Sequence, residues 1–365
     1  MPISTAMISG VMVALVAVVS CVLVRFYIGF ARTHRLFDLP NERSSHTVAT
    51  PRGGGAAIFL VWTLSLLLAA IILPFDSDVL LALVGGSAII AVVGFLDDVR
   101  SLKARTRILA HLAASLLCVG LVLLNFTKLD LGFTAWPLGI LGPVLATITM
   151  VWSINLFNFM DGMDGLAGSE AIWTCSIGGL GLWRADAQSL ALCSWLVAAA
   201  AAGFFVWNKP KAKIFMGDVG SGFLGFLIAA IALIGEARCG FPVLVWVILY
   251  GAFIFDATIT LLRRMVNGER WYGAHRSHAY QRLHHSLGWS HARVLAAISC
   301  VNLVLAGLAL WAIYDRHIVA MALGSALLFL ASLYALVERV APMTTTRQRR
   351  QVTSMKGTAG SGEEA

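Results

Sequence analysis

Long apolar stretches recur along almost the whole chain, and they restrict its fold more than any other feature of the sequence. Eleven such runs carry almost no charge, near 6–24, 55–74, 79–96, 108–126, 138–157, 165–183, 187–207, 219–235, 241–262, 292–313 and 318–339. A helix of about 20 residues spans the hydrocarbon core of a bilayer, where lipid offers no partner for unpaired backbone groups. The chain is also 59% hydrophobic and only 13% charged, which excludes an ordinary soluble domain. We therefore predict an all-α polytopic membrane protein with about eleven transmembrane helices.

The positive charges are distributed unevenly between the loops on the two sides of this predicted bundle. If the N-terminus is periplasmic, 23 of the 27 Lys and Arg residues fall in inward segments, and the outward side keeps only Lys128, Arg184, Arg238 and Arg316. Short loops rich in Lys and Arg remain in the cytoplasm. We therefore predict a periplasmic N-terminus and a cytoplasmic C-terminus. No basic residue precedes Arg25, so the first run is expected to be a retained anchor and not a cleaved signal peptide.

The composition changes once, near the C-terminus. Residues 343–365 lack apolar periodicity and are rich in small and charged residues, which is typical of disorder. We therefore predict a membrane-embedded domain over residues 1–342, expected to carry any catalysis, and a disordered cytoplasmic tail over residues 343–365. The six cysteines lie within or at the edges of apolar runs, a pattern that suggests neither a disulfide framework nor a metal knuckle.

The segment "NLFNFMDGMDGL" concentrates two amides and two carboxylates at a predicted helix end. Asn155, Asn158, Asp161 and Asp164 are three residues apart, so on a helix they drift only slowly around one face. Such side chains are hard oxygen ligands suited to Mg²⁺, and they can also bind hydroxyl groups or base edges of a nucleotide. Helix caps and turns are the alternative, because Asn, Asp and Gly commonly end helices. A cap needs one such residue, however, and not four in register.

Two further carboxylate groups lie beside basic loops on the inward side. Asp97 and Asp98 end a predicted span in "GFLDDVRSLKARTR", and Asp218 follows the basic loop in "KPKAKIFMGDVGSG". A phosphate substrate needs cations, and a reacting phosphate oxygen or its metal needs an acceptor, so these patterns favour phosphoryl chemistry. A solvated helix end for the pair, and a helix N-cap for Asp218, are the structural alternatives.

The inward loop 263–292 holds five of the nine histidines. The spacing of His275 and His278 would also suit zinc, but no Cys pair or HExxH motif accompanies them. We therefore favour phosphate binding by His275, Arg276 and His278. Upstream, Asp256 lies within a predicted span, and an intramembrane carboxylate indicates either a functional site or a structural pair with a nearby arginine.

Six motifs, taken in order and spacing, resemble a known family. They are "TPRGGG", "GFLDD", "NLFNFMDGMDGLAG", "FMGDVGSGFLG", "FDATITLLRR" and "HRSHAYQRL", and they resemble the polyprenyl-phosphate N-acetylhexosamine-1-phosphate transferases of the glycosyltransferase family 4 type. The resemblance implies a bacterial inner-membrane enzyme with its active site on the cytoplasmic face. Using Mg²⁺, or Mn²⁺, it would transfer a sugar-1-phosphate from a UDP-N-acetylhexosamine to undecaprenyl phosphate and release UMP. It implies no nucleic-acid partner, and it leaves a homodimer open.

The resemblance also assigns roles to individual residues. It implies a Mg²⁺ site at Asn158 and Asp218, and an acidic pair, Asp97 and Asp98, that contacts or deprotonates the lipid phosphate. The four aspartates with implied catalytic roles are Asp97, Asp98, Asp161 and Asp164, the last two toward the nucleotide. The candidate substrate-binding residues are Arg52, Lys103, Arg107, Asn155, Lys213, His275, Arg276 and His278.

The last motif departs from one branch of this family. Arg276 and Ser277 interrupt histidines that are consecutive in the peptidoglycan enzymes, and the pattern "HRSHAYQ" resembles the branch that initiates O-antigen-type glycans. An ordinary or deoxy UDP-N-acetylhexosamine is therefore expected, and not UDP-MurNAc-pentapeptide.

A cation-coupled transporter is the alternative from another class, but it should place polar groups near the bilayer midplane in inverted halves. A CDP-alcohol phosphotransferase should continue with a second Asp-x3-Asp, which does not follow Asp164.

Overall fold

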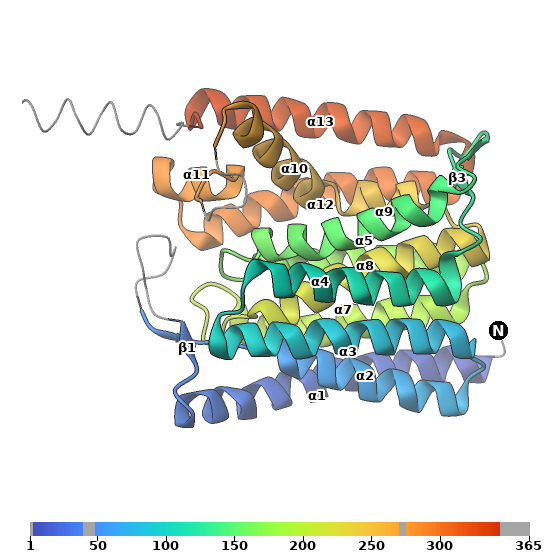
Figure 1. Ribbon diagram of the computed structural model, residues 1–365, viewed down its shortest axis with the longest axis horizontal. Helices are drawn as coiled ribbons and strands as arrows, with labels where there is room; N and C mark the ends of the chain where they lie inside the picture. Colours follow the sequence, from blue (N-terminus) through green and yellow to red (C-terminus); the bar gives the residue numbers. More distant parts are fainter. Residues whose placement is uncertain (1–2, 39–47, 270–274, 344–365) are drawn as a thin grey trace, which may run out of the picture.

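The computed structural model describes residues 3–38, 48–269 and 275–343, so the predicted tail lies outside the described residues except for Met343. The long helices are α1 (Ile3–Thr33), α2 (Gly55–Ile72), α3 (Ser77–Arg100), α4 (Ala104–Cys118), α5 (Leu141–Met160), α6 (Leu166–Arg184), α7 (Gln188–Asn208), α8 (Asp218–Cys239), α10 (Gly251–Val266), α12 (His291–Tyr314) and α13 (Val319–Val340). Shorter helical pieces are the π-helical turn η1 (Val119–Leu123), α9 (Val243–Leu249), α11 (Ala279–Leu287) and the turn η2 (Arg316–Ile318). Most of the long helices run side by side along the longest axis of the molecule (Figure 1).

The segments predicted to face the cytoplasm meet at one end of this bundle. The ends of α1, α3, α7 and α10 lie there, together with the starts of α4, α8 and α12 and the short helix α11 (Figure 1). The start of α1 and the end of α13 lie at opposite ends of the bundle (Figure 1), as an odd number of crossings requires. The clustering of the basic segments agrees with the predicted topology, although which end faces the cytoplasm stays a prediction.

Within the described part of the chain, nine helices are long and apolar enough to cross a membrane, or ten if the bent pair α9 and α10 counts as one span. This pair covers the predicted run 241–262 and bends by 78° at its break. Helix α6 covers the predicted run 165–183 and has 19 residues, but it is not among the nine. The prediction of an all-α polytopic membrane protein is confirmed.

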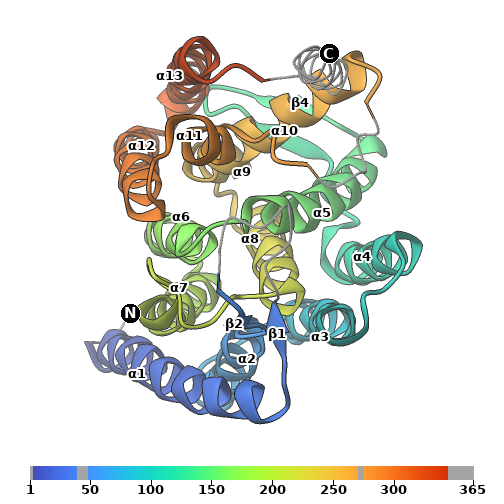
Figure 2. The same ribbon diagram turned by 90° about the vertical axis from the view of Figure 1, so that its left-hand side faces the viewer.

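Helix α8 occupies the centre of the bundle (Figure 2), and 94% of its apolar stretch is buried. Glycines explain how closely its first turns approach the neighbouring helices. A Cβ atom on Gly55 of α2 would lie 2.1 Å from the Cα of Gly220, and one on Gly94 of α3 would lie 2.6 Å from the carbonyl oxygen of Asp218. Small residues permit such backbone contact between membrane helices. The start of α8 is therefore held against the start of α2 and the end of α3.

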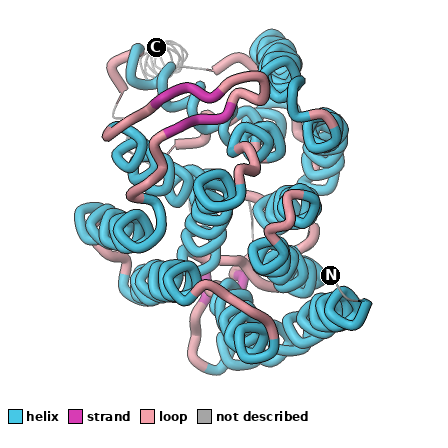
Figure 3. The backbone as a smooth tube through the Cα atoms, turned by 90° about the vertical axis from the view of Figure 1, so that its right-hand side faces the viewer, coloured by secondary structure: helices cyan, strands magenta, loops and turns pink. Residues whose placement is uncertain are grey.

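Two short antiparallel hairpins, which the sequence patterns did not predict, lie at opposite ends of the bundle (Figures 1 and 3). β1 (Phe37–Asp38) pairs with β2 (Thr50–Pro51), and β3 (Lys128–Asp130) pairs with β4 (Ala135–Pro137). The second hairpin is anchored by Glu236, which accepts hydrogen bonds from the backbone N–H groups of Asp130 (2.7 Å) and Val243 (2.6 Å). Glu236 thereby connects this hairpin to the start of α9.

Candidate active site

Carboxylates from two helices meet two arginines at the end of the bundle where the basic segments gather. Arg52 Nη2 lies 2.7 Å from Asp98 Oδ1 and 3.1 Å from Asp218 Oδ1. Arg107 Nη1 lies 3.1 Å from Asp97 Oδ2 and 3.2 Å from Asp218 Oδ2. We call these five residues the aspartate–arginine cluster. The structure therefore brings together the acidic pair at the end of α3, the aspartate at the start of α8 and two of the predicted substrate-binding arginines.

Asp98 caps the N-terminus of α8 from a different helix. Its carboxylate accepts hydrogen bonds from the backbone N–H groups of Asp218 (2.8 Å) and Val219 (3.3 Å). A carboxylate at this position is stabilised by the unpaired N–H groups and by the helix dipole. Gly217 adopts a φ of 77°, and a Cβ there would lie 2.4 Å from Asp98 Oδ2, so a glycine leaves room for this cap. Asp98 therefore joins α3 to α8, and its catalytic role stays a prediction.

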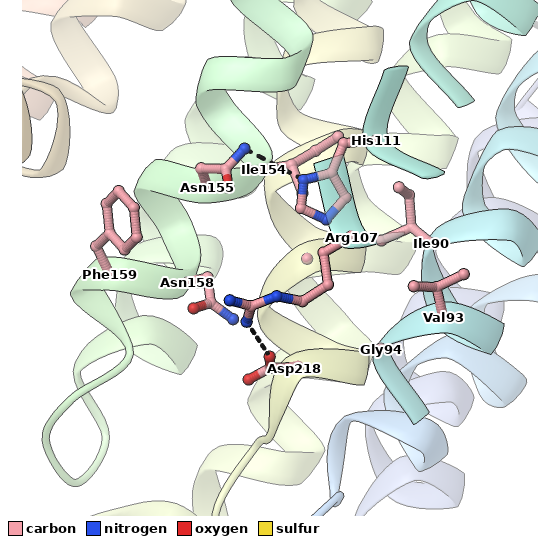
Figure 4. A pocket seen from close by; sticks show the side chains of 11 residues that line it. Ile90, Val93, Gly94, Arg107, His111, Ile154, Asn155, Asn158, Phe159 and Asp218 are labelled. Atoms are coloured by element: carbon pink, nitrogen blue, oxygen red, sulfur yellow. Dashed lines mark hydrogen bonds and ion pairs between the residues drawn. The ribbon is translucent and has the colours of Figure 1, made fainter. Parts of the chain in front are cut away.

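A cavity of about 50 Å³ lies beside the cluster, between α3, α4, α5 and α8 (Figure 4). Its polar wall is formed by Arg107, His111, Asn155, Asn158 and Asp218. Asn158 Nδ2 donates a hydrogen bond to Ser221 Oγ (3.1 Å), and the same amide lies within hydrogen-bonding reach of the Asp218 carboxylate. The two residues predicted as metal ligands are therefore neighbours.

The chemistry of these donors fits a magnesium ion that is shared with a substrate. Among the described residues, no group of three or more His, Cys, Asp or Glu side chains is arranged to hold a metal ion. The carboxylate of Asp218 and the amide of Asn158 are nevertheless hard oxygen donors, and Mg²⁺ is usually bound by one or two carboxylates together with substrate phosphates and waters. The residues fit such a site, while the presence of Mg²⁺ stays a prediction.

Asp161 lies just beyond the end of α5, in the loop that leads to α6. Enclosure by the surrounding protein raises the pKa of this carboxyl well above its usual value, and the carboxylates of Asp218 and Asp98 raise it further, against an opposing effect of Arg52. These mutual influences place Asp161 in the electrostatic field of the cluster. The catalytic role of Asp161 stays a prediction.

Asp164 is oriented by contacts on the other side of this loop. Its Oδ2 accepts a hydrogen bond from the backbone N–H of Ala212 (3.1 Å) and lies 3.1 Å from His291 Nδ1. The centre of the His291 ring lies 4.8 Å from the centre of the His284 ring. His284 Nδ1 in turn lies 2.7 Å from the carbonyl oxygen of Trp289. His291 belongs to none of the residues to which the sequence motifs assign a role. Its position could have identified it, because it lies where the inward loop meets the next predicted span, close in sequence to four other histidines.

The predicted phosphate-binding histidines are held by structural contacts. His278 is 3% exposed, and its Nδ1 lies 3.6 Å from Asp256 Oδ1. Asp256 also accepts hydrogen bonds from the backbone N–H groups of Ala279 (2.8 Å) and Tyr280 (3.4 Å), so it caps α11. The pKa of His275 is lowered to about 3, mainly by burial and in smaller part by the neighbouring His278 and Arg264. His275 is therefore neutral at neutral pH and offers a phosphate no positive charge.

The structure does not bring the two predicted lysines into the cluster. Lys103 is exposed at the start of α4. Lys213 is also exposed, and its ammonium lies 5.1 Å from the centre of the Trp207 ring. Neither lysine lines the cavity of Figure 4. Arg276 is half-buried in the same loop as His275, and its substrate-binding role stays a prediction.

The sequence analysis also missed His111, which lines the cavity one helical turn after Arg107 on α4. Its Nδ1 lies 3.2 Å from the amide nitrogen of Asn155, a predicted substrate-binding residue. Residues four apart share one face of a helix, so the spacing after Arg107 was the signal that could have identified it. Asn155 lines the cavity, but its amide nitrogen is engaged within the protein.

Comparisons with known proteins find one family model and many relatives. The model described as glycosyl transferase family 4 matches residues 80–236, which include the acidic pair of α3, the carboxylate-rich end of α5 and the start of α8. A probable undecaprenyl-phosphate N-acetylglucosaminyl 1-phosphate transferase of Bacillus subtilis is 33% identical over 278 residues, covering 73% of this chain and 74% of that protein.

Two further relatives show the range of similar proteins. The undecaprenyl-phosphate alpha-N-acetylglucosaminyl 1-phosphate transferase of Escherichia coli K12 is 28% identical over 302 residues, covering 78% of each chain. A phospho-N-acetylmuramoyl-pentapeptide-transferase of Synechococcus elongatus is 33% identical over 266 residues, covering 66% of this chain and 70% of that protein.

Proposed function

The chain belongs to the polyprenyl-phosphate N-acetylhexosamine-1-phosphate transferases of glycosyl transferase family 4, and from this premise we propose that it uses a UDP-N-acetylhexosamine donor and undecaprenyl phosphate as acceptor. An oxygen of the lipid phosphate forms a bond to the sugar-bearing phosphorus of the donor. The bond between that phosphorus and the oxygen of the uridine phosphate breaks, and UMP leaves. The products are undecaprenyl-diphospho-sugar and UMP.

One observation carries this proposal, namely that the aspartate–arginine cluster and Asn158 converge at one end of an apolar bundle. Two phosphorylated substrates repel each other unless their charge is offset. Arg52 and Arg107 each bridge two carboxylates, so each is already held where a phosphate can replace a carboxylate as its partner. Phosphoryl transfer depends mainly on such positioning and charge stabilisation.

Asp218 and Asn158 are the proposed magnesium ligands. A bound Mg²⁺ would offset the negative charge of the donor diphosphate and of the leaving UMP. Asp218 keeps its carboxylate directed toward both arginines, and Asp98 fixes the first turn of α8 that carries it. The chain thus holds the ligand residue rigidly through contacts between helices.

A large apolar cavity supports the proposed binding of a prenyl chain. It has a volume of about 550 Å³ and lies between α10, α11, α12 and α13. Its wall includes Met160 at the end of α5 and Tyr280, whose hydroxyl donates a hydrogen bond to the carbonyl of Phe159 (3.1 Å). The cavity therefore adjoins the segment that leads into Asp161, and we propose that it accommodates part of the lipid.

The proposed location is the bacterial inner membrane with the active site on the cytoplasmic face. Support comes from the excess of Lys and Arg in the segments that surround the aspartate–arginine cluster and from the positive-inside rule. The water-soluble nucleotide sugar would then reach the site from the cytoplasm. A cation-coupled transporter, the alternative from another class, is disfavoured because these carboxylates gather at one end of the bundle and the chain belongs to a transferase family.

The proposal also includes the class of sugar donor and the type of glycan that the reaction initiates. The "HRSHAYQ" pattern favours an ordinary or deoxy UDP-N-acetylhexosamine and the initiation of an O-antigen-type glycan over the donor named for the Synechococcus relative. Overall identity does not separate these donors, because the Bacillus and Synechococcus relatives are both 33% identical to this chain. A panel of UDP-sugars is therefore the appropriate test.

The test of the reaction measures UMP release by the purified protein with undecaprenyl phosphate and each UDP-sugar. We expect release with UDP-N-acetylhexosamines, loss of release after chelation of divalent cations, and recovery when Mg²⁺ or Mn²⁺ is restored. Removing a ligand or charge that acts on the reacting phosphates costs at least about a hundredfold in turnover. The turnover of the Asp218→Asn variant should therefore fall by at least this factor. Asp78→Asn, at the exposed opposite end of α3, is the matched control.

Three results would contradict these assignments. Absence of UMP release with every donor would contradict the reaction itself. Full activity in the presence of a chelator would contradict the role of Mg²⁺. Normal turnover by Asp218→Asn would contradict the proposed role of Asp218 in the reaction.

A further inference from the structure

His111 is a polar group in the active-site cavity to which neither the family motifs nor the proposed mechanism gives a task. It lies on α4 one helical turn after Arg107, and both side chains line the cavity (Figure 4). Most of the remaining wall is apolar or belongs to the residues already discussed, Asn155, Asn158 and Asp218. A histidine here is within the space that the reacting phosphates must enter.

Asn155 determines which nitrogen of the His111 ring carries the proton. The Asn155 side chain donates a hydrogen bond to the carbonyl oxygen of Val151 (2.7 Å). A carbonyl can only accept, so the group beside it is the amide nitrogen, and this same nitrogen lies 3.2 Å from His111 Nδ1. Its second hydrogen is directed to Nδ1, which must therefore be the unprotonated ring nitrogen. A neutral His111 then carries its proton on Nε2.

The protonated nitrogen is presented to the cavity beside a cation. Figure 4 shows the second ring nitrogen of His111 on the side of the ring that faces Arg107. Arg107 offers only donors, so it cannot accept the Nε2 hydrogen. In the contacts resolved for the described parts of the chain, Asn155 is the hydrogen-bond partner of the ring, through Nδ1. An N–H group and a guanidinium that line the same cavity can both donate hydrogen bonds to the oxygens of one phosphate.

We propose that His111 Nε2–H donates a hydrogen bond to a substrate phosphate oxygen that is also bound by Arg107, and that Asn155 is a positioning residue that fixes the His111 ring in this tautomer. The inference rests on the proposed function and adds a phosphate-binding residue to it. The phosphate belongs either to the prenyl phosphate or to the diphosphate of the nucleotide sugar, since both present the same oxygen chemistry. Asn155 therefore acts through His111 and does not contact the substrate itself.

The kinetic test compares two substitutions at position 111. His111→Gln keeps an N–H donor near the position of Nε2, whereas His111→Leu removes it at similar size. A hydrogen bond to a charged group corresponds to about a tenfold to hundredfold change, so His111→Leu should lower kcat/KM by that factor and His111→Gln should restore most of it. His317→Gln, in the exposed turn η2 between α12 and α13, is the matched control and should retain full activity.

The two substrates are varied separately in this experiment. A rise in KM for the prenyl phosphate alone would assign the hydrogen bond to the lipid substrate, and a rise for the UDP-sugar alone would assign it to the donor. Equal losses for His111→Leu and His111→Gln would overturn the donor role, and so would unchanged kinetics for His111→Leu. Thermal unfolding of each variant identifies any loss that comes from misfolding.

A spectroscopic test does not depend on turnover, so it separates this inference from the proposed function. Protein labelled with ¹⁵N-histidine should show the Nε2–H tautomer for His111, assigned by its absence in His111→Gln. Asn155→Leu should abolish the preference for this tautomer while His317 remains unchanged. Addition of UMP, or of a short-chain prenyl phosphate, should shift the Nε2 resonance of His111. An Nδ1–H tautomer, or no shift with either phosphate, would overturn the inference even in an active enzyme.

Discussion

Two neighbouring aspartates at the end of α3 have different surroundings, although they look equivalent in the sequence. Asp98 accepts two backbone hydrogen bonds from the first turn of α8 and contacts Arg52. Asp97 instead accepts a hydrogen bond from the backbone N–H of Leu102 and pairs with Arg107. Asp97 is therefore paired with an arginine that lines the cavity of Figure 4, whereas Asp98 contacts Arg52 and joins α3 to α8.

This difference predicts a loss of stability when Asp98 is changed. Asp98→Asn replaces a charged acceptor at a helix N-terminus, so we expect the free energy of unfolding to fall by about 1 to 3 kcal/mol. Thermal unfolding in detergent measures the change, and Asp78→Asn serves as the control on the same helix. An unchanged unfolding temperature would show that the cap of α8 does not depend on this charge.

The contact between His291 and Asp164 predicts an effect on the donor substrate. Asp164 is expected to lie toward the nucleotide, and His291 Nδ1 is 3.1 Å from its carboxylate. Loss of one hydrogen bond to a charged group costs about tenfold, so His291→Ala should raise KM for the UDP-sugar by that factor with a smaller change in kcat. His291→Asn, which retains a donor near the position of Nδ1, should restore most of the affinity. A fall in kcat with KM unchanged would refute this role.

At the scale of the elements, glycines decide how closely the helices that carry the site approach each other. The Cα of Gly94 faces the carbonyl of Asp218, and a Cβ there would lie 2.6 Å from that oxygen and from the Cα of Val219. Both neighbours are backbone, so they cannot move aside independently of their helix. The position of Asp97 and Asp98 relative to Asp218 therefore depends on this contact.

Gly94→Ala tests the contact directly. We expect the added methyl group to displace α3 from α8, to cost about 1 to 3 kcal/mol in the free energy of unfolding and to lower turnover. Gly307→Ala on α12, where nothing lies within 4 Å of the new Cβ, is the matched control and should leave turnover unchanged. Thermal unfolding and UMP release measure the two effects. Equal behaviour of the two variants would show that the close approach is not required.

Helix α11 is held in place by a charge network at its outer side. Arg282 on α11 and Arg263 on α10 each have a nitrogen 2.6 Å from Glu338 Oε2, and Arg282 also donates to the carbonyl of Ala341 (2.8 Å). Together with the cap by Asp256, these contacts fix both the start and the side of the short helix. Helix α11 is therefore positioned by contacts with α10 and with the end of α13.

At the scale of the whole molecule, the two ends of the bundle have different chemistry. One end holds the aspartate–arginine cluster and most basic segments, and the other holds the hairpin of β3 and β4 (Figures 1 and 3). The hairpin exposes Phe133 (64%) and Trp136 (62%), and aromatic side chains are common at membrane–water interfaces. The two ends therefore suit opposite faces of one membrane.

The predicted orientation follows from this asymmetry and can be measured by labelling. A cysteine introduced in place of exposed Thr134 in the hairpin, in a cysteine-free background, should react with an impermeant thiol reagent added to spheroplasts. A cysteine in place of exposed Arg105, next to the cluster, should react only after the membrane is permeabilised. The reverse pattern would overturn both the topology and the cytoplasmic placement of the active site.

Features that depend on local chemistry could be predicted from the sequence alone. A span needs about 20 apolar residues whatever its neighbours are, so the helical, membrane-embedded class followed from the runs alone. Carboxylates at helix ends, such as Asp97 and Asp218, were conspicuous because the chain otherwise avoids charge. The motif resemblance then gave the family, which the comparisons confirm.

Which of these residues meet could not be predicted from the sequence, because their contacts join distant parts of the chain. Asp98 and Asp218 are 120 residues apart, and Asn155 and His111 are 44 apart. Contacts between residues so far apart in the sequence depend on helix packing at glycines and on backbone caps. The partner in such a contact cannot be identified from the residues next to it in the sequence. For the same reason the sequence did not indicate whether the two lysines lie near the carboxylates, since a positive charge in an inward loop specifies a side of the membrane but not a partner.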